Sequence, residues 1–229
     1  MKHHSSQRRS SFLVAPAFTL VEMLVVISII SVLLTVGTLG LKNLSKASGV
    51  SAGLPIAEAL FAEARAIAVG KGTKTRVLVH GQNDRDDEFH RDRFLRYMAI
   101  QYLDTKGTED VADDTWEIAS RGSSLPKGVY FMKRLSETAA LTLEKTPPIK
   151  LPGQSMTTCY YYEFNAEGMI TFPEPSGNDV PRFVIQSGRL PPGADEPSAT
   201  DGSKKNMGGF VIWRSGRTSL FRHPDQIEN

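Results

Sequence analysis

A long apolar run near the N-terminus is the strongest pattern in the chain. From Phe18 to Leu41 the sequence is mainly apolar, and Glu22 is the single charged residue within it. As a helix rising 1.5 Å per residue, the part from Met23 to Leu41 would be roughly 28 Å long. That length is close to the hydrocarbon thickness of a bilayer, about 30 Å. The run therefore predicts a transmembrane helix over 18–41.

The charges on either side of this run predict its orientation. Lys2, Arg8 and Arg9 precede it, and Lys42 follows it. Because positive charge is retained on the cytoplasmic side of a membrane, the N-terminus is expected in the cytoplasm. We therefore expect a single-pass protein of the cytoplasmic (inner) membrane, with the rest of the chain periplasmic or otherwise extracytoplasmic.

Three other interpretations of the N-terminal run differ in how much of it they explain. A secretory signal peptide has an apolar region of about 7–15 residues followed by a small-residue cleavage site, whereas Ala15-Pro16-Ala17 precedes this longer run. A twin-arginine signal is suggested by Arg8-Arg9, but the following residues are one position off the usual spacing. A plain signal anchor explains everything except Glu22.

Glu22 is the informative residue of this segment. A carboxylate within an apolar membrane helix costs a few kcal/mol unless it has a partner, so such a residue suggests a function. The competing interpretation is an acidic residue at the start of a helix, stabilised there by the helix dipole. The residue pattern alone leaves both interpretations open.

Beyond Lys42 the pattern changes from a polar linker to a helix and then to strands. Pro55 is expected to kink or restart the helix, which continues over 56–69 with an apolar stripe and ends at Gly70 and Gly72. Alternation and turn residues then predict strands. These are Thr75–His80, Phe94–Leu103, Trp116–Ala119, Val129–Lys133, Cys159–Asn165, Met169–Phe172, Arg182–Gln186, Gly209–Arg214 and Thr218–Arg222.

The segments between these strands are expected to be turns and loops. Residues 165–168 and 214–217 each carry a glycine where a tight hairpin turn needs positive φ. Residues 188–207 are rich in Pro, Gly, Ser and Asp and predict a mobile loop. In Tyr160-Tyr161-Tyr162, Tyr161 is expected to face opposite to its neighbours. We therefore expect a largely antiparallel β-domain of about 160 residues, enough to bury a core.

The segment from Ala17 to Ile27 reads Ala-Phe-Thr-Leu-Val-Glu-Met-Leu-Val-Val-Ile. It resembles the class III signal of type IV prepilins and pseudopilins. The resemblance implies cleavage between Ala17 and Phe18 by a membrane-embedded prepilin peptidase, which also methylates the new N-terminal Phe18. It further implies that Glu22 of one subunit neutralises the Phe18 amine of its neighbour in a filament. Ala17 departs from the glycine most common at the cleavage site.

Two later motifs, Glu63–Ala68 and Phe164–Gly168, are loosely similar to those of H-type minor pseudopilins and related minor pilins. The resemblance implies an α+β, pilin-like fold: a long N-terminal transmembrane helix packed on a largely antiparallel β-sheet head. The expected organisation is a cleaved basic leader over 1–17, a helix over 18–69 and a head domain over 70–229.

This resemblance also implies a function and a set of partners. The chain would be a minor subunit of a type II secretion pseudopilus or type IV pilus. Its partners would be the prepilin peptidase, other pilin or pseudopilin subunits, the inner-membrane assembly platform and the membrane itself. The alternative is a single-span, membrane-anchored envelope binding protein that does not polymerise.

Composition and charge narrow the remaining function classes. The chain has 229 residues, of which 40% are hydrophobic and 23% charged, and its net charge is +2. This near-neutral balance gives no reason to expect a nucleic-acid partner, which needs a concentrated basic face. Cys159 is the only cysteine, so the chain can form no intramolecular disulfide.

Candidate chemistry in the rest of the chain is weak. The acidic segment 81–93 contains oxygen ligands of the kind calcium prefers, but interleaved arginines favour a solvated hairpin loop. Gly70-Lys71-Gly72 lacks the spacing of a phosphate-binding loop. His80, His90 and His223 show no metal-ligand spacing. We therefore expect no enzymatic activity, no catalytic residue, no metal and no cofactor.

Overall fold

The computed structural model describes residues 19–84, 87–106, 114–153, 156–177, 179–191, 194–199 and 206–221, with helix side chains placed at 19–33 and from residue 49 onward, Phe89 excepted. Contacts divide the chain into two units, Met1–Lys42 and Asn43–Asn229. Helix α1 (Leu20–Lys71) contributes to both units.

The side chains of α1 form two stretches of different character. The helix is 52 residues long, and its side chains are described over 20–33, where they are mainly apolar, and over 49–71. The second stretch includes Glu58, Glu63, Arg65 and Lys71 and packs its apolar residues against strands.

In the part of the chain with placed side chains, no helix is both long enough and apolar enough to cross a membrane. This finding contradicts the predicted transmembrane helix over 18–41 and the predicted single-pass position in the cytoplasmic (inner) membrane. It also overturns the pilin-like fold class, which was defined by that helix.

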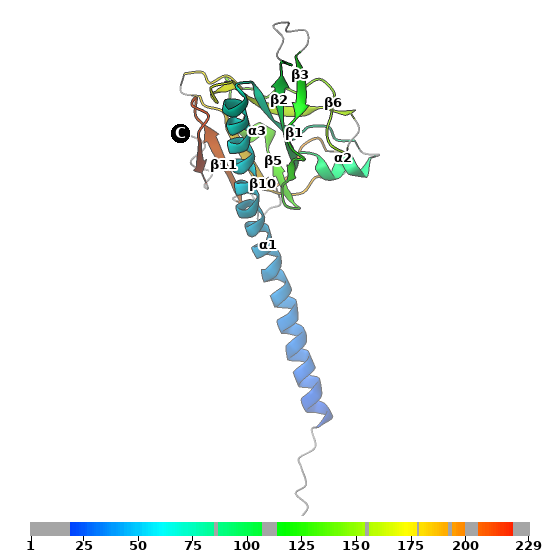
Figure 1. Ribbon diagram of the computed structural model, residues 1–229. Coiled ribbons are helices and arrows are strands. Elements are labelled where there is room, and N and C mark those ends of the chain that lie inside the picture. The colour runs from blue at the N-terminus through cyan, green and yellow to red at the C-terminus, as the bar shows by residue number, and fades with distance from the viewer. Residues whose placement is uncertain are drawn as a thin grey trace, which may run out of the picture. The chain divides into compact units, whose positions relative to one another are not determined.

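Antiparallel strands form most of the regular secondary structure of the second unit (Figure 1). The larger sheet has the order β3-β2-β1-β8-β9, with β4 also paired to β2. Its strands are β1 (Thr75–His80), β2 (Tyr97–Asp104), β3 (Thr115–Ile118), β4 (Ser123–Ser124), β8 (Cys159–Phe164) and β9 (Ile170–Phe172).

A second sheet and a small hairpin complete the strands. The second sheet has the order β12-β11-β10-β5, formed by β5 (Val129–Phe131), β10 (Arg182–Ser187), β11 (Met207–Ile212) and β12 (Thr218–Phe221). β6 (Ile149–Lys150) pairs with β7 (Met156–Thr157). Two short helices, α2 (Glu88–Arg93) and α3 (Lys133–Ser136), lie between strands.

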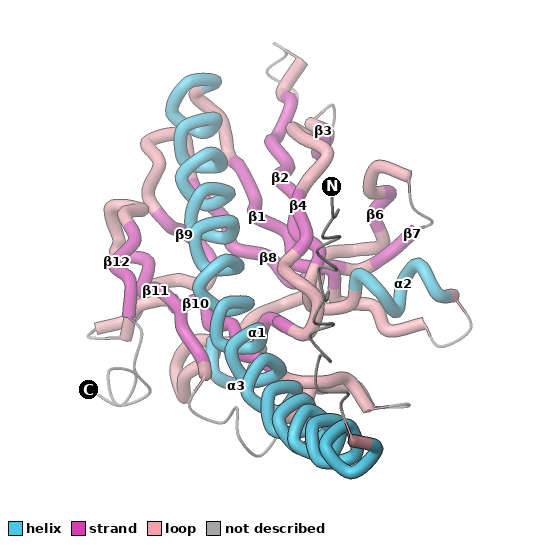
Figure 2. The backbone as a smooth tube through the Cα atoms, turned by 90° about the horizontal axis from the view of Figure 1, so that it is seen from below, coloured by secondary structure: helices cyan, strands magenta, loops and turns pink. Residues whose placement is uncertain are grey.

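The second half of α1 packs against both large sheets (Figure 2). Its buried face follows helical spacing, so one stripe enters the core while the opposite side stays exposed. That stripe consists of Val50, Leu54, Ala57, Leu60, Phe61, Ala64 and Ala68. Gly72, with φ of +62°, ends the helix, and the Thr73 amide bonds the Ala68 carbonyl at 3.1 Å.

Phe61 is the centre of the core. Its ring makes edge contacts with Tyr162 at 5.1 Å between centroids, with Phe183 at 5.3 Å and with Phe210 at 5.0 Å. Tyr162 belongs to the larger sheet, whereas Phe183 and Phe210 belong to the second sheet. One helix side chain therefore joins the two sheets.

The predicted strands are confirmed, each overlapping a strand of the structure. The strand expected from Phe94 instead begins at Tyr97, because Leu95 has a φ of +53° that interrupts extended backbone. The solvated loop expected over 81–93 is wrong in part. Residues Glu88–Arg93 form α2, and the His90 side chain on it is only 2% exposed.

Candidate functional site

The start of α1 is fixed by a reciprocal pair of residues. The Thr19 amide donates to Glu22 Oε2 at 3.3 Å, and the Thr19 hydroxyl donates to the same oxygen at 3.2 Å. The Glu22 amide donates in return to Thr19 Oγ1 at 3.2 Å. This is a capping box, which satisfies amides that the first helical turn leaves unpaired. Glu22 therefore has a local role at the helix start, as the second of its two interpretations expected.

The two predicted processing residues cannot be placed beside Glu22. Ala17 and Phe18 lie outside the described residues, and so does the side chain of Leu41. Thr19, the first described residue, is exposed and immediately precedes the first residue of α1. The proposed contact between the Phe18 amine and a neighbour's Glu22 stays a prediction.

Apart from Glu22, the first turns of α1 present a mainly apolar, exposed surface. Ser28 and Ser31 turn their hydroxyls back onto the helix, donating to the carbonyls of Leu24 at 2.8 Å and Ile27 at 2.7 Å. A helix that is apolar all round is normally covered by other structure. The exposed large apolar residues here are Leu20, Val21, Met23, Leu24, Val25, Val26, Ile27, Ile29, Ile30, Val32 and Leu33.

Arg65 connects the second half of α1 to two hairpin turns. Its Nε donates to the carbonyl oxygens of Gly168 and Ser215, each at 3.2 Å. Gly168 and Gly216 have φ of +75° and +74°, so both predicted turn glycines adopt the left-handed region. The structure thus brings Arg65 of the first later motif together with Gly168 of the second.

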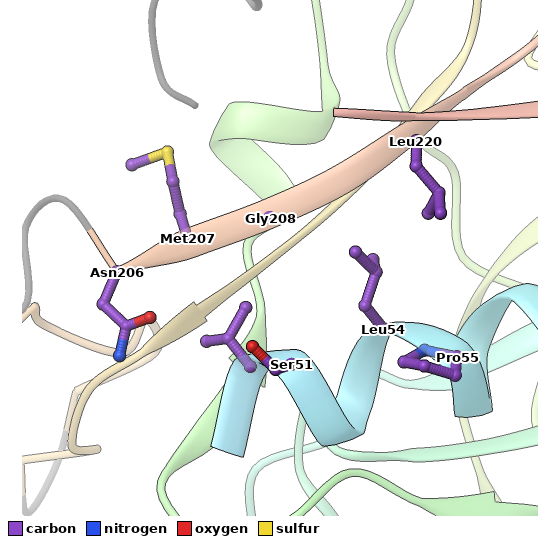
Figure 3. A pocket seen from close by; sticks show the side chains of 8 residues that line it. Ser51, Leu54, Pro55, Asn206, Met207, Gly208 and Leu220 are labelled. Atoms are coloured by element: carbon purple, nitrogen blue, oxygen red, sulfur yellow. The ribbon is translucent and has the colours of Figure 1, made fainter. Parts of the chain in front are cut away.

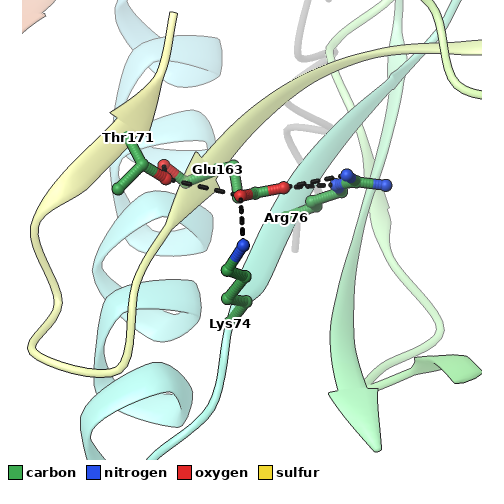
Figure 4. Close-up of polar contacts among 4 residues, drawn as sticks. All are labelled: Lys74, Arg76, Glu163 and Thr171. Atoms are coloured by element: carbon green, nitrogen blue, oxygen red, sulfur yellow. Dashed lines mark hydrogen bonds and ion pairs between the residues drawn. The ribbon is translucent and has the colours of Figure 1, made fainter. Parts of the chain in front are cut away.

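A polar cluster crosses the face of the larger sheet (Figure 4). Arg76 donates from Nε to Glu163 Oε2 at 2.9 Å, and its Nη2 lies 2.8 Å from the same oxygen. Lys74 Nζ lies 3.7 Å from Glu163 Oε1, and the Thr171 hydroxyl donates to the Glu163 carbonyl at 3.2 Å. The arginine charge is thereby neutralised within the sheet rather than offered to a ligand.

The Arg76 guanidinium is also enclosed by aromatic rings. It lies 3.9 Å from the ring centroid of Trp116 and 4.5 Å from that of Tyr161, and Tyr161 stacks on Phe172 at 4.6 Å. The expected alternation of Tyr160–Tyr162 is confirmed, since Tyr162 is buried in the core and Tyr161 packs with the cluster on the opposite face. The ring faces are occupied by one another, so this cluster stabilises the sheet.

A cavity of about 160 Å³ lies between the second half of α1 and the second sheet. Figure 3 shows Leu54 and Leu220 pointing toward each other across it. None of its lining residues titrates near neutral pH, so the cavity offers apolar contact and no acid–base chemistry. The lining residues are Val50, Ser51, Leu54, Pro55, Asn206, Met207, Gly208 and Leu220.

The acidic segments do not assemble a metal centre in the described part of the chain. No group of three or more His, Cys, Asp or Glu residues there could hold an ion. Sequence reasoning missed one pair of residues, His80 and His90, whose rings lie 5.2 Å apart between centroids in the interior. Their spacing in the sequence did not indicate a contact, because α2 was not predicted.

Comparisons with known proteins give this chain no family: no family model, no curated protein and no solved structure matches it.

Proposed function

We propose that the chain is a structural subunit of a filament, a minor pseudopilin or minor pilin that prepilin peptidase cuts between Ala17 and Phe18. The observation that carries the proposal is the order of residues over 17–27: a small residue, Phe-Thr-Leu, one further residue and Glu22. A basic leader precedes this order, and an apolar helix follows it. Each part corresponds to a step: recognition, cleavage and assembly.

The exposed apolar surface of α1 supports assembly. Leu20 is 82% exposed, and Ile27 and Leu33 are 61% and 64% exposed. Leaving such side chains in water costs roughly 1.5–3 kcal/mol each relative to full burial. We assign one occupant to this surface, the equivalent helix of neighbouring subunits in the filament. The other pilin-like subunits of the filament would each supply an apolar helix to this surface.

Glu22 supports the same proposal through its charge. Two of the three hydrogen bonds of the capping box use the same carboxylate oxygen, Oε2, and a carboxylate has two oxygens able to accept. Cleavage before Phe18 would create a new cationic amine close to this carboxylate. When neighbouring helices pack and exclude water, attraction between a Glu22 carboxylate and a neighbour's amine becomes much stronger than in water.

Mass spectrometry of the protein from its native host tests the processing step. We expect an N-terminal Phe18 carrying one methyl group, with residues 1–17 removed. Replacing Ala17 with Trp should block cleavage, because the small residue at the cut site is lost. A mature N-terminus at Met1, or one beyond Leu41, would contradict the proposal.

A further inference from the structure

Two buried histidines face each other where β1 ends. His80 is the last residue of β1 and is fully buried, and His90 on α2 is 2% exposed. His80 Nε2 lies 3.1 Å from His90 Nδ1, and the Thr157 hydroxyl lies 3.1 Å from the same His80 nitrogen. The first contact joins α2 to β1, and the second joins β1 to β7.

The distance between the two rings allows one proton between the facing nitrogens but not two. Two ring nitrogens at 3.1 Å form a hydrogen bond only if one donates and the other accepts. When both rings are protonated, His80 Nε2 and His90 Nδ1 both carry N–H groups, and these point at each other. No acceptor then remains between them, and two positive charges meet in the interior.

Two cationic side chains also lie near His80. Arg93 on α2 and Lys145 are both close enough to disfavour charge on His80, and the Lys145 ammonium donates to the Gly81 carbonyl at 2.8 Å. Burial first, and then the charges of His90, Arg93 and Lys145, lower the pKa of His80 to about 4. Protonation of His80 is therefore opposed by repulsion from these positive charges.

One described carboxylate and two neutral groups also lie near the pair. Asp87 Oδ2 lies 3.7 Å from His90 Nε2, but its side chain is 40% exposed and so is screened by water. Burial raises the pKa of the Cys159 thiol to about 12, and burial also raises the pKa of Tyr97. Both groups are therefore neutral at the pH values where histidines titrate.

The residues that follow α2 are anchored independently of the pair. Phe94 and Leu95 are 3% and 2% exposed, and the Phe131 amide donates to the Leu95 carbonyl at 2.7 Å. The Leu95 amide in turn donates to the His80 carbonyl at 2.9 Å. Separation of the histidine rings can therefore free α2 while the chain from Phe94 onward stays in the core.

We propose that the His80–His90 contact is an acid-sensitive latch, which holds α2 on β1 at neutral pH and releases it when both rings are protonated. Because the released state binds more protons, docking is most stable above the ordinary histidine pKa of 6.5 and weakens as the pH falls toward about 4. An environment that acidifies would thus expose the surface beneath α2 without unfolding the sheets.

Hydrogen exchange of the full-length chain between pH 7 and pH 4 tests the latch, with rates corrected for the intrinsic effect of pH. We expect protection of the Arg91 and Phe94 amides, which bond Asp87 and His90 carbonyls across α2, to fall at least about tenfold. Amides of β10 and β11 should keep their protection over the same range. In His90→Gln, which cannot gain a charge, α2 protection should no longer depend on pH.

Three results would overturn the latch. One is unchanged α2 protection in the wild type, and another is an equal loss in the strands, which would indicate general acid unfolding. The third is the same pH dependence in His90→Gln. If that variant does not fold, ring nitrogen chemical shifts of the wild type decide instead. Both rings must gain protons over the pH range where α2 loses protection, and rings that stay neutral there would refute the proposal.

Discussion

Replacing Gly216 with alanine tests how closely α1 and the two hairpin turns are packed. Gly216 has φ of +74°, and its amide bonds the Trp213 carbonyl at 2.7 Å within the turn. A Cβ added there would overlap the Gly168 carbonyl oxygen and would lie 3.0 Å from Arg65 Cδ. The nearest obstacle is backbone, which cannot rotate away as a flexible side chain can.

The expected cost has two parts. A left-handed conformation costs a non-glycine residue roughly 1–2 kcal/mol, and overpacking costs about 1–3 kcal/mol more. Together these predict a loss of about 2–5 kcal/mol in the free energy of unfolding. Displacing Gly168 also disturbs the acceptor of the Arg65 bond at 3.2 Å, so the upper part of that range is favoured.

Urea unfolding followed by circular dichroism measures this loss, with Gly72→Ala as the matched control. Gly72 has a similar φ of +62°, but no described atom lies within 4 Å of the place that an added Cβ would take. The control therefore carries the backbone cost alone, roughly 1–2 kcal/mol. Equal losses in the two variants would refute the packing around Arg65, because no steric part would remain.

Two further substitutions probe the core and the sheet face. Phe61→Ala should lower the free energy of unfolding by about 3–5 kcal/mol, measured by urea unfolding, because Phe61 is 1% exposed and joins both sheets. A loss below about 1 kcal/mol would contradict that role. Glu163→Gln should cost about 1–3 kcal/mol, because it removes the charge that Arg76 bonds at 2.8 Å where the two side chains are only 18% and 12% exposed. A cost that disappears at about 1 M salt would identify the pair as solvent-screened instead.

Local sequence signals predicted the strands and turns well. Thr75–His80 and Cys159–Phe164 were predicted as strands and form two adjacent strands of the larger sheet; β1 is buried at every position except Arg76, and β8 is buried at Cys159, Tyr162 and Phe164. Gly168 and Gly216 marked two hairpin turns, since each needs positive φ. Signals of this kind depend only on neighbours in the chain.

Features that depend on distant residues were not predictable. Arg65 could be seen as a helix residue, but its bonds to Gly168 and Ser215 depend on how two hairpins dock. The facing of His80 and His90 depends on α2, whose sequence of charged residues favoured a solvated loop. Periodicity in the sequence does not indicate how the hairpins or α2 pack against the rest of the fold.

The transmembrane helix is the prediction that fails. Hydropathy over 18–41 predicted a membrane span, whereas no helix in the part of the chain with placed side chains is both long enough and apolar enough to cross a membrane. Farther along the same helix, outside the predicted span, Ala57 and Phe61 are buried against the sheets. Apolar character alone does not say which partner covers a helix.

The most direct test of the proposed function separates the charge of Glu22 from its capping role. Glu22→Gln removes the charge but keeps a residue that can complete the capping box, whereas Thr19→Ala keeps the charge and removes the cap, at about 1 kcal/mol. The measurement is the amount of tagged protein in sheared filaments, or crosslinked to other pilin-like subunits, relative to the cleaved pool. The proposal predicts a sharp fall for Glu22→Gln and near wild-type incorporation for Thr19→Ala. Equal incorporation of wild type and Glu22→Gln, or a matching fall in Thr19→Ala, would contradict it.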